Sequence, residues 1–211
     1  LLLPEKANGS GFGVPKEIVL LLVIASTVFL LKMLPGQVRS NLQRQYKIFG
    51  NRHTWVMSVI YTMTFGSFIG FAAAFPLAIK VIFGYSHIEG ADGVMTHDVV
   101  NPNGPSALMY AWMGAFIGAL IRPVGGWIAD KVGGAMVTQI ITLVMVISSL
   151  GVAYYMKAAY NSATPEEYFV PFFLLFLLLF AATGIGNGST FRTISQVFNK
   201  EQAGPVLGWT S

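Results

Sequence analysis

One arginine lies inside an apolar segment long enough to cross a membrane. Arg122 occurs in SALMYAWMGAFIGALIRPVGGWI, residues 106–128, and a charged side chain at the centre of a bilayer costs about 2.5–3.5 kcal/mol or more. Such a side chain is retained where it faces a polar interior and meets an anion, a carboxylate or a backbone carbonyl. Its planar fork of N–H donors suits a pair of oxygens on a flat oxyanion. The alternative is a cation near the inner membrane surface that pairs with Asp130 or a helix end.

Two aromatic residues in an earlier apolar segment have the spacing of a common helix face. Tyr61 and Phe65 lie four residues apart within residues 54–79, so their side chains are neighbours on one side of a helix. Aromatic rings can enclose a flat ion, and the hydroxyl of Tyr61 can donate a hydrogen bond to it. Taken alone, such a pair is more often part of ordinary packing between helices.

A Gly-rich segment, GGWIADKVGG at residues 125–134, follows the arginine and carries one acid and one base. We expect a turn here, with Asp130 capping or forming an ion pair with a neighbouring helix and serving as a conformational latch. Arg192, near the end of a later apolar segment, is expected to be an interfacial anchor.

The elements that position these residues are predicted to be membrane helices. The chain of 211 residues is 54% hydrophobic and only 10% charged, whereas soluble domains carry roughly 25% charged residues. About 20 apolar residues are needed to cross a bilayer core about 30 Å thick. Five segments fit, and a sixth begins near Gly204 and is cut short: 17–34, 54–79, 106–128, 135–156 and 168–191. The sequence therefore predicts an all-α membrane protein, and we expect it to be part of a longer chain.

The distribution of basic residues in the connecting loops predicts the orientation of these helices. Loop 35–53 carries four basic residues and no acid, so it should be cytoplasmic, whereas loop 84–105 carries three acids and no base and should be a flexible outer loop. The remaining loops keep this alternation. The modest formal charge of +4 bears on this topology rather than on a nucleic-acid partner, and we expect none.

The composition excludes several kinds of site. There is no cysteine, so disulfides and thiolate metal sites are absent. All three histidines lie outside the apolar segments, whereas a haem-carrying membrane subunit needs axial histidines within its helices. We therefore expect no metal, no cofactor and no enzymatic activity.

Three segments, taken in order, carry a resemblance to a known family. They are YTMTFGSFIGFAAAFP (61–76), GALIRPVGGWIADKVGG (118–134) and GIGNGSTFRTISQVF (184–198), and they resemble the nitrate/nitrite porters (NarK type) of the major facilitator superfamily. Within the second, the family's loop motif G-x-x-x-D-[RK]-x-G-G matches Gly126, Asp130, Lys131, Gly133 and Gly134.

The resemblance implies the C-terminal half of the superfamily's helical bundle, from about helix 6 to helix 11. Residues 1–34 would contain the end of helix 6, residues 35–53 the cytoplasmic loop between the two halves, and residues 54–211 the C-terminal bundle. The N-terminal half of the same protein would be its partner across the transport pathway.

The resemblance also implies a function and a site. The function is secondary active transport of nitrate and nitrite across the inner membrane by alternating access, with the anion held between one arginine from each half. The matching positions in this chain are Arg122, Tyr61, Phe65 and Phe191, and Asn187 offers an amide to the anion or to a neighbouring helix.

The coupling mode is inferred from titratable residues. None of the four inner segments has Asp, Glu or His well inside it, and proton-coupled carriers usually need a titratable relay there. This favours nitrate/nitrite exchange over proton symport. The alternatives are a proton-coupled nitrate symporter, a carrier of another small anion, and a membrane sensor or anchor that transports nothing.

Overall fold

The computed structural model describes residues 15–33, 36–90 and 93–211. The chain forms two units, residues 1–50 and residues 51–211. The first contains α1 (Lys16–Lys32), α2 (Gly36–Gln45) and a 3-10 turn η1 (Tyr46–Gly50). With 17 residues, α1 rises only about 26 Å, short of a full bilayer core. The segment predicted as a loop over 35–53 is largely helical, because residues such as Leu42 and Gln43 have good helix propensity.

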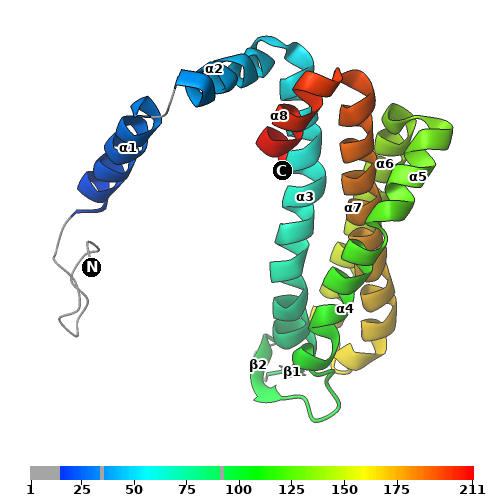
Figure 1. Cartoon of the computed structure of the whole chain (residues 1–211). Helices are drawn as coiled ribbons and strands as arrows, with labels where there is room; N and C mark the ends of the chain where they lie inside the picture. The colour runs from blue at the N-terminus through cyan, green and yellow to red at the C-terminus, as the bar shows by residue number, and fades with distance from the viewer. Residues whose placement is uncertain (1–14, 34–35, 91–92) are drawn as a thin grey trace. The chain divides into compact units, whose positions relative to one another are not determined.

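The second unit is a bundle of membrane-length helices (Figure 1). It contains α3 (Arg52–Ala78) with a π-helical end η2 (Ile79–Phe83), β1 (Tyr85–Glu89), β2 (Met95–Val100), α4 (Ala107–Leu120), α5 (Arg122–Val132), α6 (Gly134–Tyr160), a 3-10 turn η3 (Pro165–Tyr168), α7 (Phe169–Val197) and α8 (Lys200–Thr210). Asn51 caps α3 by accepting a hydrogen bond of 3.0 Å from the amide of His53.

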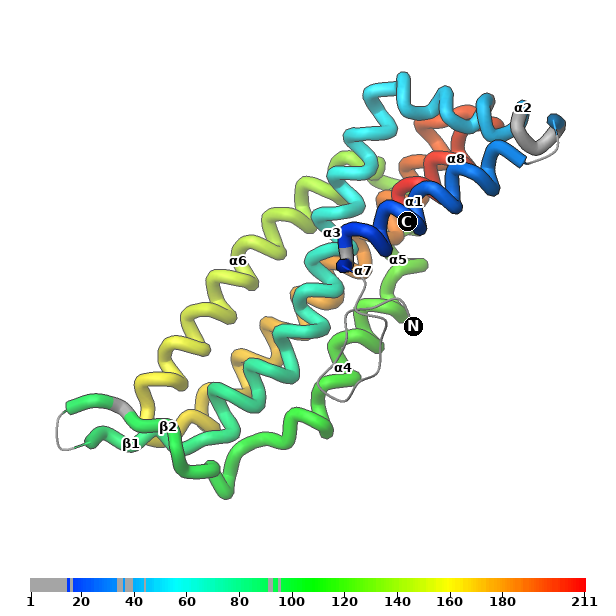
Figure 2. Tube along the Cα trace, turned by 90° about the vertical axis from the view of Figure 1, so that its left-hand side faces the viewer, coloured from blue at the N-terminus to red at the C-terminus, as the bar shows by residue number. Residues whose placement is uncertain are grey.

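Four spans within the described residues are long and apolar enough to cross a membrane: Arg52–Phe83, Ala107–Val132, Gly134–Tyr160 and Pro165–Val197. They run side by side in both views (Figures 1 and 2). The chain is a multi-pass membrane protein, and the predicted all-α bundle is confirmed. The first of the five expected spans, at 17–34, forms α1, whose 17 described residues make it shorter than these four.

Helix α7 is the centre of the bundle and contacts α3, α4, α5 and α6. Its phenylalanines interleave with those of α3 and η2: Phe176 lies 4.8 Å from Phe75 between ring centroids, and Phe172 lies 4.9 Å from Phe83. All four rings are at most 3% exposed. Edge and tilted ring pairs of this kind stabilise beyond their buried area, so this cluster fixes α3 against α7.

Glycines bring α4 and α5 into backbone contact with α7. A Cβ on Gly184 would collide with the carbonyl of Gly118, and one on Gly188 would collide with the carbonyl of Arg122. Gly125 meets the backbone of Ile185 in the same way. Close approach through small residues is the usual way to pack helices in lipid, and here it places Arg122 directly against α7.

The predicted span 106–128 is not one continuous helix. It breaks at Ile121 between α4 and α5, because Pro123 has no amide hydrogen for the helix ladder and its ring clashes with the preceding turn. The segment 125–134, expected as a turn, is helical as far as Val132. The turn is confined to Gly133, whose φ of 94° is strongly disfavoured for residues with a Cβ.

The loop predicted to be flexible over 84–105 instead contains a β-hairpin at one end of the bundle (Figure 1). His87 stacks on His97 with 4.4 Å between ring centroids, and its Nδ1 lies 2.7 Å from the carbonyl oxygen of Tyr160 at the end of α6. Asn101 donates a hydrogen bond of 2.8 Å to Glu166. These long-range contacts order the segment despite its Gly and Asn content.

Candidate functional site

Arg122 begins α5 just after the break in the helix. Its Cζ lies 5.5 Å from the ring centroid of Phe65 and 5.1 Å from that of Phe68, over both ring faces. Among the described residues, its buried Nε has no hydrogen-bond partner and no carboxylate lies within ion-pair distance of the guanidinium. Within the described part of the chain, the charge is therefore held by π faces, which attract a cation but do not accept conventional hydrogen bonds from its N–H groups.

The aromatic cluster beside Arg122 comprises Tyr61, Phe65 and Phe68 of α3 and Phe191 of α7. Tyr61 stacks on Phe65 with 5.1 Å between centroids, and Phe191 lies 5.0 Å from Tyr61. The structure thus brings together four of the five residues expected at the site. Phe68 was not among them, although its spacing of three residues from Phe65 places it on the same helix face.

Asn187, the fifth residue, lies on α7 one turn before Phe191. It is fully buried, and both Nδ2 and Oδ1 lack a hydrogen-bond partner in the part of the chain that the structure describes. A buried amide without partners costs about 1–3 kcal/mol for each unsatisfied group. Such an arrangement is retained where another helix or a bound molecule completes the hydrogen bonds.

The acid of the loop motif pairs across two helices, at the end of the bundle opposite the hairpin (Figure 1). Asp130 of α5 accepts a short hydrogen bond from Nε of Arg192 on α7, and a second of 3.1 Å from Nε2 of Gln196. The alternative in which Asp130 neutralises Arg122 is therefore wrong, because this carboxylate binds Arg192. Arg192, expected as an interfacial anchor, forms this ion pair, and the pair agrees with the expectation that Asp130 bonds to a neighbouring helix. Nζ of Lys131 lies 3.8 Å from the ring centroid of Trp127.

The glycines of the loop motif have different structural roles. Gly133 provides the positive φ that turns α5 into α6, and a Cβ on Gly134 would collide with Oγ1 of Thr193. A Cβ on Gly126 would instead meet only the carbonyl of Gly188 at 3.7 Å, an ordinary contact. The loop motif therefore sets the α5–α6 turn and its packing on α7 mainly through its last two glycines.

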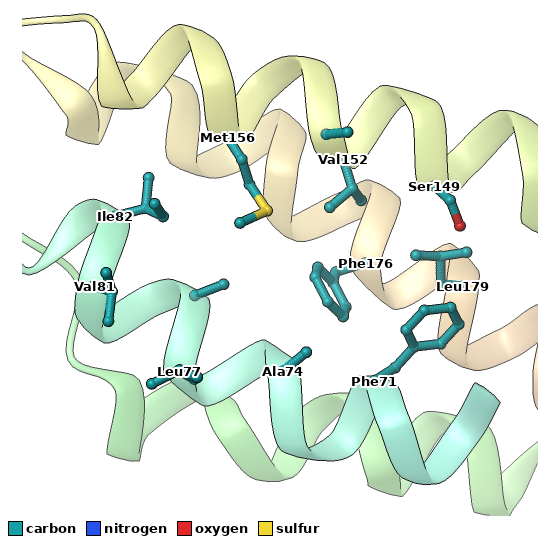
Figure 3. A pocket seen from close by; sticks show the side chains of 12 residues that line it. Phe71, Ala74, Leu77, Val81, Ile82, Ser149, Val152, Met156, Phe176 and Leu179 are labelled. Atoms are coloured by element: carbon teal, nitrogen blue, oxygen red, sulfur yellow. The ribbon is translucent and has the colours of Figure 1, made fainter. Parts of the chain in front are cut away.

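A cavity of about 450 Å³ lies away from the arginine, between α3, α6 and α7 (Figure 3). Ala74, Val152 and Phe176 are among its lining residues, and Ser149 supplies its one polar side chain. Without a charge or an array of donors, this cavity does not suit an anion. The candidate site is the group formed by Arg122, Asn187 and the aromatic cluster.

The whole described bundle also matches a family. The model for the Major Facilitator Superfamily matches residues 17–211. The chain belongs to this superfamily. The match includes all four membrane-length spans and agrees with the bundle predicted from the three sequence segments.

Relatives within the superfamily carry names that concern nitrate and nitrite. The chain is 38% identical over 174 residues to the "Probable nitrate/nitrite antiporter NarK2" of Thermus thermophilus, covering 82% of this chain and 35% of that protein. It is 34% identical over 162 residues to the "Nitrate/nitrite transporter NarU" of Escherichia coli (strain K12), covering 77% and 30%. It is 24% identical over 196 residues to the "Nitrite extrusion protein" of Bacillus subtilis (strain 168), covering 90% and 42%.

The chain thus spans about a third of the length of the first two relatives. The resemblance to nitrate/nitrite porters drawn from the three segments is confirmed by these matches. The names of these relatives describe carriers, in agreement with the expectation that the protein is not an enzyme.

Proposed function

We propose that the full-length protein carries nitrate and nitrite across the cytoplasmic membrane. The observation that carries this proposal is the guanidinium of Arg122, which lies in a membrane helix bundle against two phenylalanine faces and without a carboxylate among the described residues. A cation in that state attracts an anion. The similarity to relatives named as nitrate/nitrite transporters supports the choice of anion.

The chemistry of the site suits a flat, weakly hydrated oxyanion. The guanidinium can donate two parallel hydrogen bonds to two nitrate oxygens, and the hydroxyl of Tyr61 and the amide of Asn187 can donate further hydrogen bonds. The rings of Phe65 and Phe191, which flank Tyr61, can cover the faces of the ion. In the proposed mechanism the N-terminal half of the protein supplies the opposite wall and a second arginine.

Transport would proceed by alternating access, in which the two halves rock about a site near the middle of the membrane. The ion pair between Asp130 and Arg192, which joins α5 to α7, would help to hold one of the conformations. Within the spans, residues 54–79, 107–128, 135–156 and 169–191 contain no Asp, Glu or His. The proposed mode is therefore exchange of nitrate for nitrite without proton coupling.

A flux experiment with the full-length protein in proteoliposomes tests this proposal. Vesicles are loaded with nitrite or left without it, and uptake of ¹⁵N-nitrate is measured with and without a proton uncoupler. We expect uptake that needs internal nitrite, resists the uncoupler and is lost in Arg122→Gln. Uptake into nitrite-free vesicles that the uncoupler abolishes would replace exchange by symport, and absence of any flux would refute the carrier function.

A further inference from the structure

We propose that Phe68 is a positioning residue that holds the guanidinium of Arg122 ready for the anion. This inference deepens the proposed function and rests on it. Of the two rings beneath Arg122, that of Phe68 is the nearer, at 5.1 Å from Cζ. Phe65 and Phe68 present nearly parallel planes, 8° apart, so both faces can meet one cation.

Holding the cation with rings has a consequence that a carboxylate would not have. An ion pair with a carboxylate neutralises the guanidinium and uses its N–H donors. A ring face attracts the cation through the quadrupole of the ring and leaves the charge uncompensated and the outward donors free for an oxyanion. The buried, unpartnered Nε of Arg122 agrees with an arginine that is fixed mainly by such contacts.

The position of the Phe68 ring is itself fixed by contacts with α4 and α7. A Cβ on Gly118 would lie 2.6 Å from Cε2 of Phe68, so the ring occupies space that exists only because residue 118 is glycine. On its other side it meets the edge of Phe180, with 5.7 Å between centroids and planes at 84°. Phe180 is fully buried, and close packing around it leaves the ring of Phe68 little room to move on that side.

The two rings therefore have different tasks. Phe65 stacks on Tyr61 and belongs to the wall that would cover the ion. Phe68 contacts Phe65, Phe180 and the slot at Gly118, and would act on the anion only through Arg122. Weakening this one cation–π contact should lower nitrate affinity about three- to thirtyfold, with a smaller effect on the maximal transport rate.

Progressive fluorination of the ring tests this role. In the full-length protein, Phe68 is replaced by mono-, di- and trifluorophenylalanine through nonsense suppression, and nitrate affinity and maximal uptake rate are measured. Fluorine withdraws electron density from the ring face while changing its shape little. We expect affinity to fall stepwise with each fluorine, Phe68→Leu to weaken it at least as much as the trifluoro ring, and Phe68→Tyr to retain most of it.

The matched control is the same fluorine series at Phe71, one turn further along α3. Its ring packs edge-on against Phe176 and Phe180, and it makes no cation–π contact with a residue that the structure describes. A flat series at position 68, or an equal slope at position 71, in a protein that binds nitrate would overturn the role of Phe68 and leave the proposed function intact. Failure of the unmodified protein to bind nitrate would overturn both.

Discussion

At the scale of single residues, the shape of the guanidinium of Arg122 should matter as much as its charge. A lysine would keep the positive charge but lose the planar fork that pairs with two oxygens. We expect Arg122→Lys to weaken nitrate binding about ten- to a hundredfold, the equivalent of one or two charge-assisted hydrogen bonds. Isothermal titration of the full-length protein measures this.

Arg52→Lys is the matched control, since Arg52 is exposed at the start of α3 and should bind nitrate like the unmodified protein. Unchanged affinity in Arg122→Lys would mean that a point charge suffices. That outcome would favour a less selective carrier of small anions.

Asn187 offers a second prediction, because its amide is fully buried and has no partner among the described residues. Leucine keeps the branched shape of asparagine, with bulkier ends, and removes the unsatisfied groups, so Asn187→Leu should raise the Tm of the ligand-free protein. The same change should lower nitrate affinity at least about tenfold if the amide binds the anion. Thermal unfolding and nitrate titration on one preparation measure both effects.

The control for that substitution is Thr183→Val, a buried position on α7 whose hydroxyl already bonds the carbonyl of Phe180 at 2.9 Å. It should leave nitrate affinity unchanged. A sharp fall in the Tm of Asn187→Leu would show that another part of the full-length protein binds the amide, and would contradict its assignment to the anion.

At the scale of helices, the contact of α5 with α7 depends on particular glycines rather than on glycine content. A Cβ on Gly125 would lie 2.7 Å from Cα of Ile185, where only backbone can yield, whereas one on Gly126 has ordinary contacts. We expect Gly125→Ala to lower the Tm by several degrees and to reduce transport, because α5 must shift away from α7 and carry Arg122 with it.

Gly126→Ala, at the neighbouring position on the same helix, is the control and should be tolerated. It even gains helix propensity of about 1 kcal/mol. The comparison separates packing from motif membership, since Gly126 belongs to the loop motif and Gly125 does not. Equal loss of stability in both variants would contradict the close packing of α5 on α7 at Gly125.

Helices of this kind are the part of the fold that sequence predicts well. Twenty apolar residues in lipid must satisfy their own backbone hydrogen bonds and so become helix, and the last four predicted spans are present. The break at Ile121 depends on Pro123, and hydropathy does not predict it, because the hydropathy of a segment is not sensitive to one missing amide hydrogen. The hairpin over 85–100 depends on contacts such as His87 with Tyr160, which are distant in sequence and leave no local pattern.

The residues of the candidate site likewise fall into those that local sequence predicts and those that depend on contacts between helices. Local sequence is enough to identify Arg122, which is a charge in an apolar segment. It is also enough to identify Tyr61 and Phe65, which are aromatic residues four positions apart. The role of Phe68 could not be predicted in this way, since it depends on Gly118 and Phe180, which belong to other helices. The pairing of Asp130 with Arg192 rather than Arg122 likewise depends on how α5 and α7 lie against each other.

At the scale of the whole molecule, a weak ion pair can still control a conformational balance. Side chains of Arg192 and Asp130 are 50% and 40% exposed, and pairs this accessible contribute about 0.2–1 kcal/mol. That is too little to change stability noticeably, but it alters the ratio of two nearly equal conformations by up to about fivefold. We therefore expect Asp130→Asn to leave the Tm within about 2 °C of its original value.

The same substitution should shift the population of conformations in the full-length protein. Cysteine labelling is a direct measure, since the chain has no cysteine of its own. A single cysteine at Ser195, an exposed position near Arg192, reports access from that end of the bundle, and Asp130→Asn should change its labelling rate up to about fivefold. The exchange Asp130→Arg with Arg192→Asp should restore part of the original rate, because it re-forms the pair with its charges reversed. An unchanged labelling rate in Asp130→Asn would leave the pair as a packing contact and remove it from the transport cycle.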